Sequence, residues 1–198
     1  MITNTQLFID DESILIELQE AMIQRLKDIN SNVQVQAIFA INRLQNPNDQ
    51  ACQIIQAFIF LMEHDPSWKV RLQALAYVGF SRKTIPYIID RVRDMHPMVR
   101  QKAILILSEK VLIKFINIEK RIFILNSSLK DVDQTVVETC CNKLLPSWLR
   151  FKENNIIKLL KGLDVVQATD TIELMLNKMH ENDCLKTLCK DFTLINKK

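Results

Sequence analysis

One pattern recurs along this chain and constrains its fold more than any other feature. The segment that begins at Asp65 reads DPSWKVRLQAL, and the segment that begins at Asp94 reads DMHPMVRQKAI. Both place Val-Arg at the same distance after the Asp, and both place Ala three residues after that Arg. Internal repeats of this kind are typical of proteins that are built from stacked structural units.

Two further copies share this register, and they begin at Asp28 and Asp131. The position five residues after the Asp is always Val, namely Val33, Val70, Val99 and Val136. The position nine residues after it is small, namely Ala37, Ala74, Ala103 and Cys140. The position thirteen residues after it is aliphatic, namely Ile41, Val78, Leu107 and Leu144. A weaker fifth copy begins at Asp164.

Each copy reads as a pair of helices. Amphipathic stretches precede the five Asp residues, over 15–27, 51–63, 84–93, 118–129 and 155–163. A second stretch with helical spacing of apolar residues follows each Asp, and we expect the Asp to N-cap this second helix. With 2 Gly and 5 Pro in 198 residues, the chain has too few turn residues for a strand-rich fold. The sequence predicts an all-α protein.

A helical pair of this size cannot bury its apolar face alone, so neighbouring pairs are expected to stack. The repeat length and the Asp…Val-Arg…Ala pattern favour HEAT-type repeats. We predict an α-solenoid of about five HEAT-type hairpins, an ARM-like superhelix. It spans residues 1–198 as a single segment without an internal domain boundary. Its units are predicted at 11–46, 49–80, 84–112, 115–150 and 154–180.

Several classes of chemistry lack the residues that they need. Gly79 and Gly162 lie too far apart to form a phosphate-binding loop. Cys184 and Cys189 have no second pair at zinc-binding spacing. The sequence does not indicate a nucleophile paired with a general base. We therefore expect no enzyme activity, no cofactor, no metal and no small-molecule substrate. The N-terminal residues do not form a signal peptide, and we expect an intracellular protein without a membrane partner.

The charge is unevenly distributed. Residues 65–121 contain 12 basic and 5 acidic side chains, whereas residues 1–64 contain 3 basic and 8 acidic ones. A basic middle segment between acidic and neutral ones suggests an anionic partner.

The repeated Asp and Arg residues have two interpretations. In a solenoid, each Asp can pair with the Arg of a neighbouring unit, which gives a structural ladder. Its candidate members are Asp28, Asp65, Arg71, Asp94, Arg100 and Asp131. Gln34 and Val137 occupy the Arg position without a charge. This interruption fits a ladder, and it fits equally a DNA site that is confined to the middle repeats.

Cations outside the repeat register are the better candidates for contact with nucleic-acid phosphates. Arg82 and Lys83 precede one helix, and Arg91 and Arg93 lie near its end, with a solvated surface as the alternative. Lys69, Lys102 and Lys110 are further candidates. Trp68 is a candidate partner-binding residue, although packing between repeats is an alternative for it. Trp148 and the apolar run 57–62 are expected in the interior.

Longer strings resemble the HEAT-repeat G subunit of the condensin complex. They are EAMIQRLKDINSNVQVQAIFAINRLQNPND, SRKTIPYIIDRVRDMHPMVRQKAILILSEKV and KLLPSWLRFKENNIIKLLKGLDV. The resemblance covers about residues 20–179, and it departs at Val137 and in the segments 1–10 and 180–198. Members of that family are several times longer, so we expect an internal piece, a truncated gene model or a shortened paralogue.

The resemblance implies a non-catalytic scaffold in mitotic chromosome condensation. In that family the subunit binds the kleisin subunit of condensin, and the two together bind double-stranded DNA independently of sequence. The implied location is the nucleus or the chromosomes, with the cytoplasm as an alternative. The alternative function is a HEAT-repeat adaptor that binds proteins and has no affinity for DNA.

Overall fold

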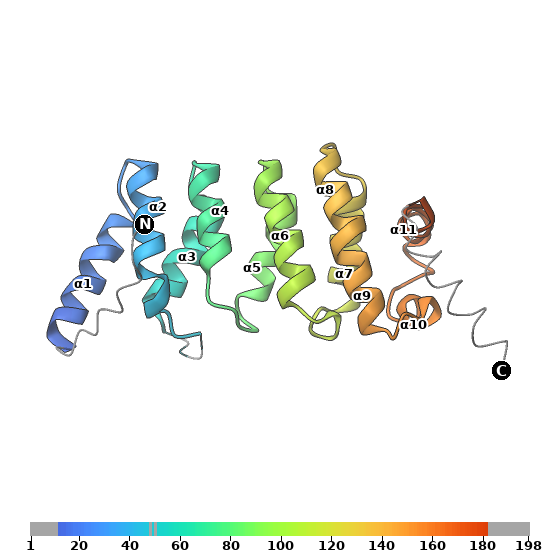
Figure 1. Cartoon of the computed structure of the whole chain (residues 1–198), viewed down its shortest axis with the longest axis horizontal. Helices are drawn as coiled ribbons and strands as arrows, with labels where there is room; N and C mark the ends of the chain where they lie inside the picture. Colours follow the sequence, from blue (N-terminus) through green and yellow to red (C-terminus); the bar gives the residue numbers. More distant parts are fainter. Residues whose placement is uncertain (1–11, 48, 50, 182–198) are drawn as a thin grey trace, which may run out of the picture. The chain divides into compact units, whose positions relative to one another are not determined.

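The computed structural model describes residues 12–47, 49 and 51–181, and every element within these ranges is helical. The predicted all-α fold of HEAT-type hairpins is therefore confirmed. The chain divides into two compact units, Met1–Ser81 and Arg82–Lys198. Each unit is a stack of helical hairpins (Figure 1). Asp11, at which the first repeat is predicted to begin, lies outside the described residues.

The first unit contains two hairpins. Helix α1 (Glu12–Arg25) packs on α2 (Ser31–Ile41), which continues into the short 3-10 helix η1 (Asn42–Leu44). Helix α3 (Gln53–His64) packs on α4 (Trp68–Tyr77). Helix α4 also packs on α2, so the second helices of the two hairpins lie side by side.

The second unit contains the remaining hairpins. Its elements are α5 (Ile85–Asp90), η2 (Arg91–Arg93), α6 (Pro97–Lys110), η3 (Ile113–Phe115), α7 (Ile118–Leu129), α8 (Gln134–Thr139), η4 (Cys140–Leu144), α9 (Leu145–Phe151), α10 (Ile156–Leu160) and α11 (Thr169–Glu181). Helices α8, η4 and α9 form one unbroken helical segment that packs along α6. Figure 1 shows this segment beside α6, with α5 and α7 behind them.

The repeated apolar positions form the core of both units. All four small residues are at most 4% exposed, and three of the four valines are completely buried. Small side chains at the contact allow helices to approach closely, which a stack of hairpins requires. The apolar run 57–62 is only partly interior, because Phe58 and Met62 are buried whereas Phe60 is 62% exposed. Six helical residues cover more than one full turn, so one of them faces outward.

The second helix of the fourth repeat contains a π-helical turn, η4. Pro146 lies just after this turn, near the start of α9. Proline has no N–H, and its ring would clash with the carbonyl of Asn142 in a regular α-helix. A π turn changes the hydrogen-bond register and accommodates the proline. Burial raises the pKa of the Cys140 thiol in this turn, which is consistent with a packing role for that side chain.

Candidate nucleic-acid interface

The repeated Asp residues build the turns between paired helices. One carboxylate oxygen of each Asp accepts a hydrogen bond from the backbone N–H two residues later, at 2.8 to 2.9 Å. This Asx turn recurs at Asp28, Asp65, Asp94 and Asp131.

The expectation that these Asp residues N-cap the second helices is wrong. The N-caps are the residues whose backbone N–H donates the Asx-turn bond, namely Asn30, Ser67, His96 and Asp133. Two chain positions separate each Asp from the helix start, so its carboxylate closes the turn before the helix begins. In the fifth copy Asp164 instead accepts from the N–H of Gln167, three residues later.

Two of these Asp residues, Asp65 and Asp131, also accept hydrogen bonds from the preceding repeat. Arg100 donates to Asp131 through Nε at 2.6 Å and through Nη2 at 2.7 Å. In the first unit the uncharged Gln34 fills the equivalent position, and its Nε2 donates to Asp65 Oδ2 at 2.9 Å. A side-chain amide and a guanidinium therefore serve the same contact between repeats.

The two repeat-locked arginines also bind the turn of their own repeat. Arg71 Nη1 donates to the carbonyl of Asp65 at 2.8 Å, and Arg100 Nη1 donates to the carbonyl of Asp94 at 2.9 Å. The side chains of Arg100 and Asp131 are 12% and 4% exposed. The hydrogen bonds to Asp131 raise the pKa of Arg100. Val137, at the equivalent position of the next repeat, is buried and contributes packing alone.

The seven predicted phosphate-contacting cations differ in exposure. Five are exposed, namely Lys69, Arg82, Lys83, Arg93 and Lys110, and two are half-buried, namely Arg91 and Lys102. Arg91 lies 3.9 Å from Asp94, so its charge is partly balanced within the second unit. The Arg93 guanidinium lies over the Phe123 ring at 4.4 Å, and its Nε donates to Ser127 at 2.9 Å.

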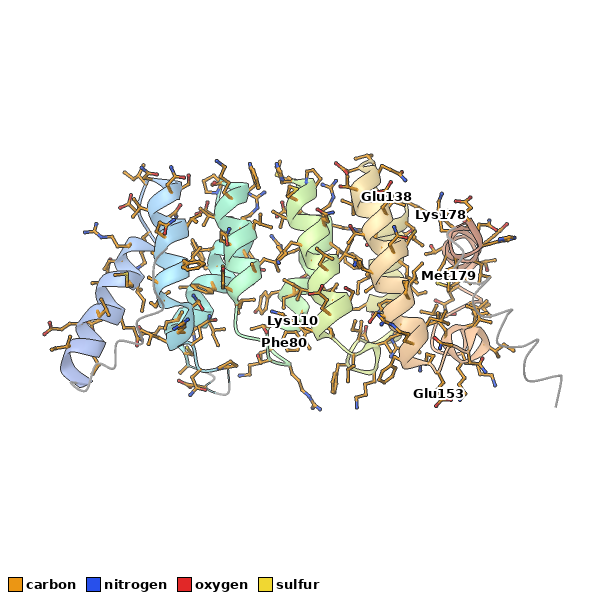
Figure 2. The ribbon with its side chains drawn as sticks, viewed as in Figure 1. Phe80, Lys110, Glu138, Glu153, Lys178 and Met179 are labelled. Atoms are coloured by element: carbon orange, nitrogen blue, oxygen red, sulfur yellow. The ribbon has the colours of Figure 1, made fainter. Side chains whose placement is uncertain are left out.

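Six cations of the second unit fall toward one or the other end of its hairpins. We call the end that carries the turns 94–96 and 131–133 the turn end. The opposite end, where one repeat passes into the next at 82–84 and 111–117, is the loop end. Arg91, Arg93 and Arg100 lie toward the turn end, and Arg82, Lys83 and Lys110 lie at the loop end. Figure 2 labels Lys110 at the loop end and Glu138 toward the turn end.

A groove of about 470 Å³ opens at the loop end, and sequence reasoning missed it. This loop-end groove is lined by Arg82, Ile85, Pro86, Ile89, Lys114, Phe115, Ile116, Asn117 and Lys120. The Arg82 guanidinium lies 5.6 Å from the centre of the Phe115 ring, and the Lys114 ammonium lies 5.1 Å from it. Phe115 lies outside the repeat register. The signal available in the sequence was an aromatic residue among cations, in LIKFINIEK.

Arg121, another cation of the basic segment, serves the fold. Its Nη1 donates to the carbonyl of Gly162 at 2.6 Å, and its Nε donates to the carbonyl of Ile113 at 3.2 Å. Burial lowers the pKa of this guanidinium. It joins α7 to the connection that follows α10, so the net charge of the segment overstates the charge that is available to a partner.

The two tryptophans differ in environment. Trp148 is 1% exposed and belongs to the core of the second unit, as expected. Trp68 is half-buried at the first position of α4.

Within the described ranges no group of His, Cys, Asp and Glu could hold a metal ion. The helices of these ranges include none that is long and apolar enough to cross a membrane. Cys184 and Cys189 lie outside the described residues.

Comparison with known proteins adds the family context. The model of the family described as non-SMC mitotic condensation complex subunit 1 matches residues 70–190. Condensin complex subunit 3 of Homo sapiens is 36% identical over 169 residues, which make up 85% of this chain and 17% of that protein. The protein of the same name from Schizosaccharomyces pombe is 30% identical over 86% of this chain and 20% of its own length.

A solved structure is also similar. The crystal structure of the S. pombe condensin Cnd3-Cnd2 subcomplex contains a chain that matches with a TM-score of 0.85 and 28% identity. The match covers 92% of this chain and 25% of that one. The chain thus spans a quarter or less of the length of these relatives.

Proposed function

This chain belongs to the family of non-SMC mitotic condensation complex subunit 1, and from that premise we propose that it is a non-catalytic scaffold of a condensin-like complex. Its proposed partners are the kleisin subunit and double-stranded DNA, and its proposed place of action is the mitotic chromosome in the nucleus. The observation that carries the proposal is the likeness to a chain solved in a Cnd3-Cnd2 subcomplex. The repeat core and the Asp-centred turns support a scaffold that is built from stacked hairpins.

The DNA contact is proposed to run through exposed cations outside the ladder. Lys83 and Lys110 are exposed at the loop end, and Arg93 is exposed beside Phe123. Arg82 and Lys69 are further exposed candidates, while Lys102 and Arg91 are half-buried. Flexible cations on a surface neutralise phosphates without reading bases, so the binding should be independent of sequence and sensitive to salt.

One experiment tests both partners. The chain is co-expressed with the kleisin subunit of condensin, the complex is purified, and its binding to duplex DNA is titrated at several salt concentrations. We expect co-elution of the two proteins and a linear fall of log affinity with log salt. Reversal of Lys83, Arg93 and Lys110 to Glu should lower the affinity at least about tenfold and flatten the salt slope.

The matched control reverses three exposed cations elsewhere in the second unit, Lys143, Arg150 and Lys161. This variant changes the net charge equally, so an equal loss of affinity would mean that only the overall charge matters. Co-elution without DNA binding at low salt would favour the alternative function, a protein-binding HEAT adaptor. Failure to co-elute with the kleisin subunit would contradict the condensin scaffold itself.

A further inference from the structure

The loop-end groove combines an apolar floor with a cationic rim. Ile85, Ile89 and Ile116 on its floor are each at most 6% exposed. Phe115 stands at the rim and is 46% exposed. Arg82 and Lys114 beside it are exposed as well. An aromatic side chain left half in water between two cations leaves apolar area available to a partner.

The cations of the rim are positioned by rings. Arg82 and Lys114 approach Phe115, at 5.6 and 5.1 Å from the ring centre, and Lys120 approaches Phe123 at 5.1 Å. A cation–π contact orients a charge without neutralising it. Lys120 also pairs with Asp90 at 3.1 Å. The nine lining residues, all in the described part of the chain, include three cations and no acid.

The volume and the apolar floor of the groove favour a peptide over duplex DNA as its ligand. A volume of about 470 Å³ lies within the range of sites that enclose side chains or small molecules. The backbone of duplex DNA presents charged phosphates and sugars, and it has no apolar group to fill an isoleucine-lined floor. A peptide can place one apolar side chain on the floor and carboxylates or phosphates against the rim.

We propose that the loop-end groove binds a short acidic segment of a partner polypeptide, with one aromatic or large aliphatic side chain as its anchor. The anchor packs on Phe115 and the three buried isoleucines. Flanking acidic groups pair with Arg82 and Lys114, whereas the charge of Lys120 is partly balanced by Asp90. This site is separate from the proposed DNA contacts at Lys83, Arg93 and Lys110, which do not line the groove.

The test uses the full chain and a fluorescein-labelled synthetic peptide in which glutamates flank a central phenylalanine on both sides. Binding is measured by fluorescence anisotropy. We expect Arg82→Glu with Lys114→Glu to weaken the peptide affinity at least about tenfold. Phe115→Ala alone should weaken it about fivefold, because it removes the apolar contact and the positioning of both cations. A peptide with alanine in place of the phenylalanine should bind about fivefold more weakly to the original chain.

The control variant carries Lys83→Glu and Lys110→Glu, which changes the net charge by the same amount outside the groove. It should alter peptide affinity less than about threefold, a difference expected from the long-range field alone. An equal loss in this control, or equal binding of the alanine peptide, would reduce the effect to general charge attraction and overturn the proposal. A dissociation constant weaker than about 1 mM for the phenylalanine peptide would also overturn it.

Duplex DNA separates this site from the proposed function. We expect excess duplex to leave most of the peptide bound, since Lys83, Arg93 and Lys110 lie outside the groove and only Arg82 is a candidate for both ligands. Full displacement of the peptide by DNA, together with loss of DNA affinity in Phe115→Ala, would assign the groove to nucleic acid instead. Loss of DNA affinity only in the variant with Lys83→Glu and Lys110→Glu would support both proposals. Absence of DNA binding with intact peptide binding would contradict the DNA contact alone.

Discussion

Two sites of the second unit, the Arg100–Asp131 contact at the turn end and the Phe115 cluster at the loop end, use the same kinds of cation for opposite purposes. At the turn end, Arg100 is held by Asp131 through two hydrogen bonds and is 12% exposed. At the loop end, Arg82 and Lys114 lie against the Phe115 ring and remain exposed. A guanidinium that is buried with a carboxylate serves the stack, whereas one that is oriented by a ring remains available to an anionic partner. The immediate environment of a cation, more than the number of cations, indicates its role.

The largest effect that we expect is a loss of stability when Arg100, at the turn end, is replaced. Arg100→Ala leaves the Asp131 carboxylate, which is 4% exposed, without its guanidinium partner. Removal of one partner of a buried pair costs about 3 kcal/mol or more in the free energy of unfolding. Lys114→Ala at the loop end should change the free energy of unfolding by less than about 0.5 kcal/mol, as surface substitutions usually do.

Urea unfolding followed by far-UV circular dichroism measures both variants. Equal destabilisation by Arg100→Ala and Lys114→Ala would contradict the division of roles between the two ends. The double variant Arg100→Ala with Asp131→Ala supplies the coupling energy between the two side chains.

A smaller effect is expected at the uncharged position of the first unit. Gln34 donates to the carbonyl of Leu26 at 3.1 Å and to Asp65 at 2.9 Å. Gln34→Ala removes two hydrogen bonds from a buried site, and we expect a loss of about 1–2 kcal/mol. Because an amide carries no charge, this loss should be smaller than that of Arg100→Ala in the same urea experiment. A larger loss would mean that the charge of the guanidinium adds nothing to the contact between repeats.

The sequence was sufficient to predict the features that recur with the repeat, above all the buried small residues between hairpins. Ala74 and Ala103 share one register position and are both completely buried, because every hairpin meets its neighbour at the same point. The capping role was assigned to the wrong residue, because the repeated Asp and N-caps such as Asn30, Ser67 and Asp133 are all residue types that cap helices, and only the turn geometry tells them apart.

The groove could not be predicted in the same way. Arg82 and Phe115 are far apart in sequence and meet only where the start of α5 approaches the connection before α7. Neither residue occupies a repeated position, so periodicity carries no information about their contact. The π turn before Pro146 was missed for a related reason. One proline within a helical pattern does not say whether the helix ends, kinks or changes its register.

The smallest effect that we expect is a change in how the stability of the fold depends on pH under acidic conditions, caused by Asp133 at the turn end. The hydroxyl of Thr135 and then its backbone N–H donate to the Asp133 carboxylate, and they lower the pKa of Asp133 below its usual 3.8. A carboxylate with a lowered pKa adds stability above the unfolded-state pKa, and this contribution is lost as the pH falls through the folded-state pKa.

The wild-type melting temperature should therefore fall more steeply with acidification below about pH 4 than that of Asp133→Ala. Thr135→Val should give an intermediate slope, because it removes the hydroxyl bond and keeps the backbone one. Lys114→Ala leaves Asp133 and its hydrogen bonds unchanged, so this variant should keep the wild-type slope. If Asp133→Ala and the wild type lose stability in parallel, the hydrogen bonds of Thr135 are equally present in the unfolded chain. The stability of the turn end would then come from its other contacts, of which the pair of Arg100 and Asp131 is the strongest.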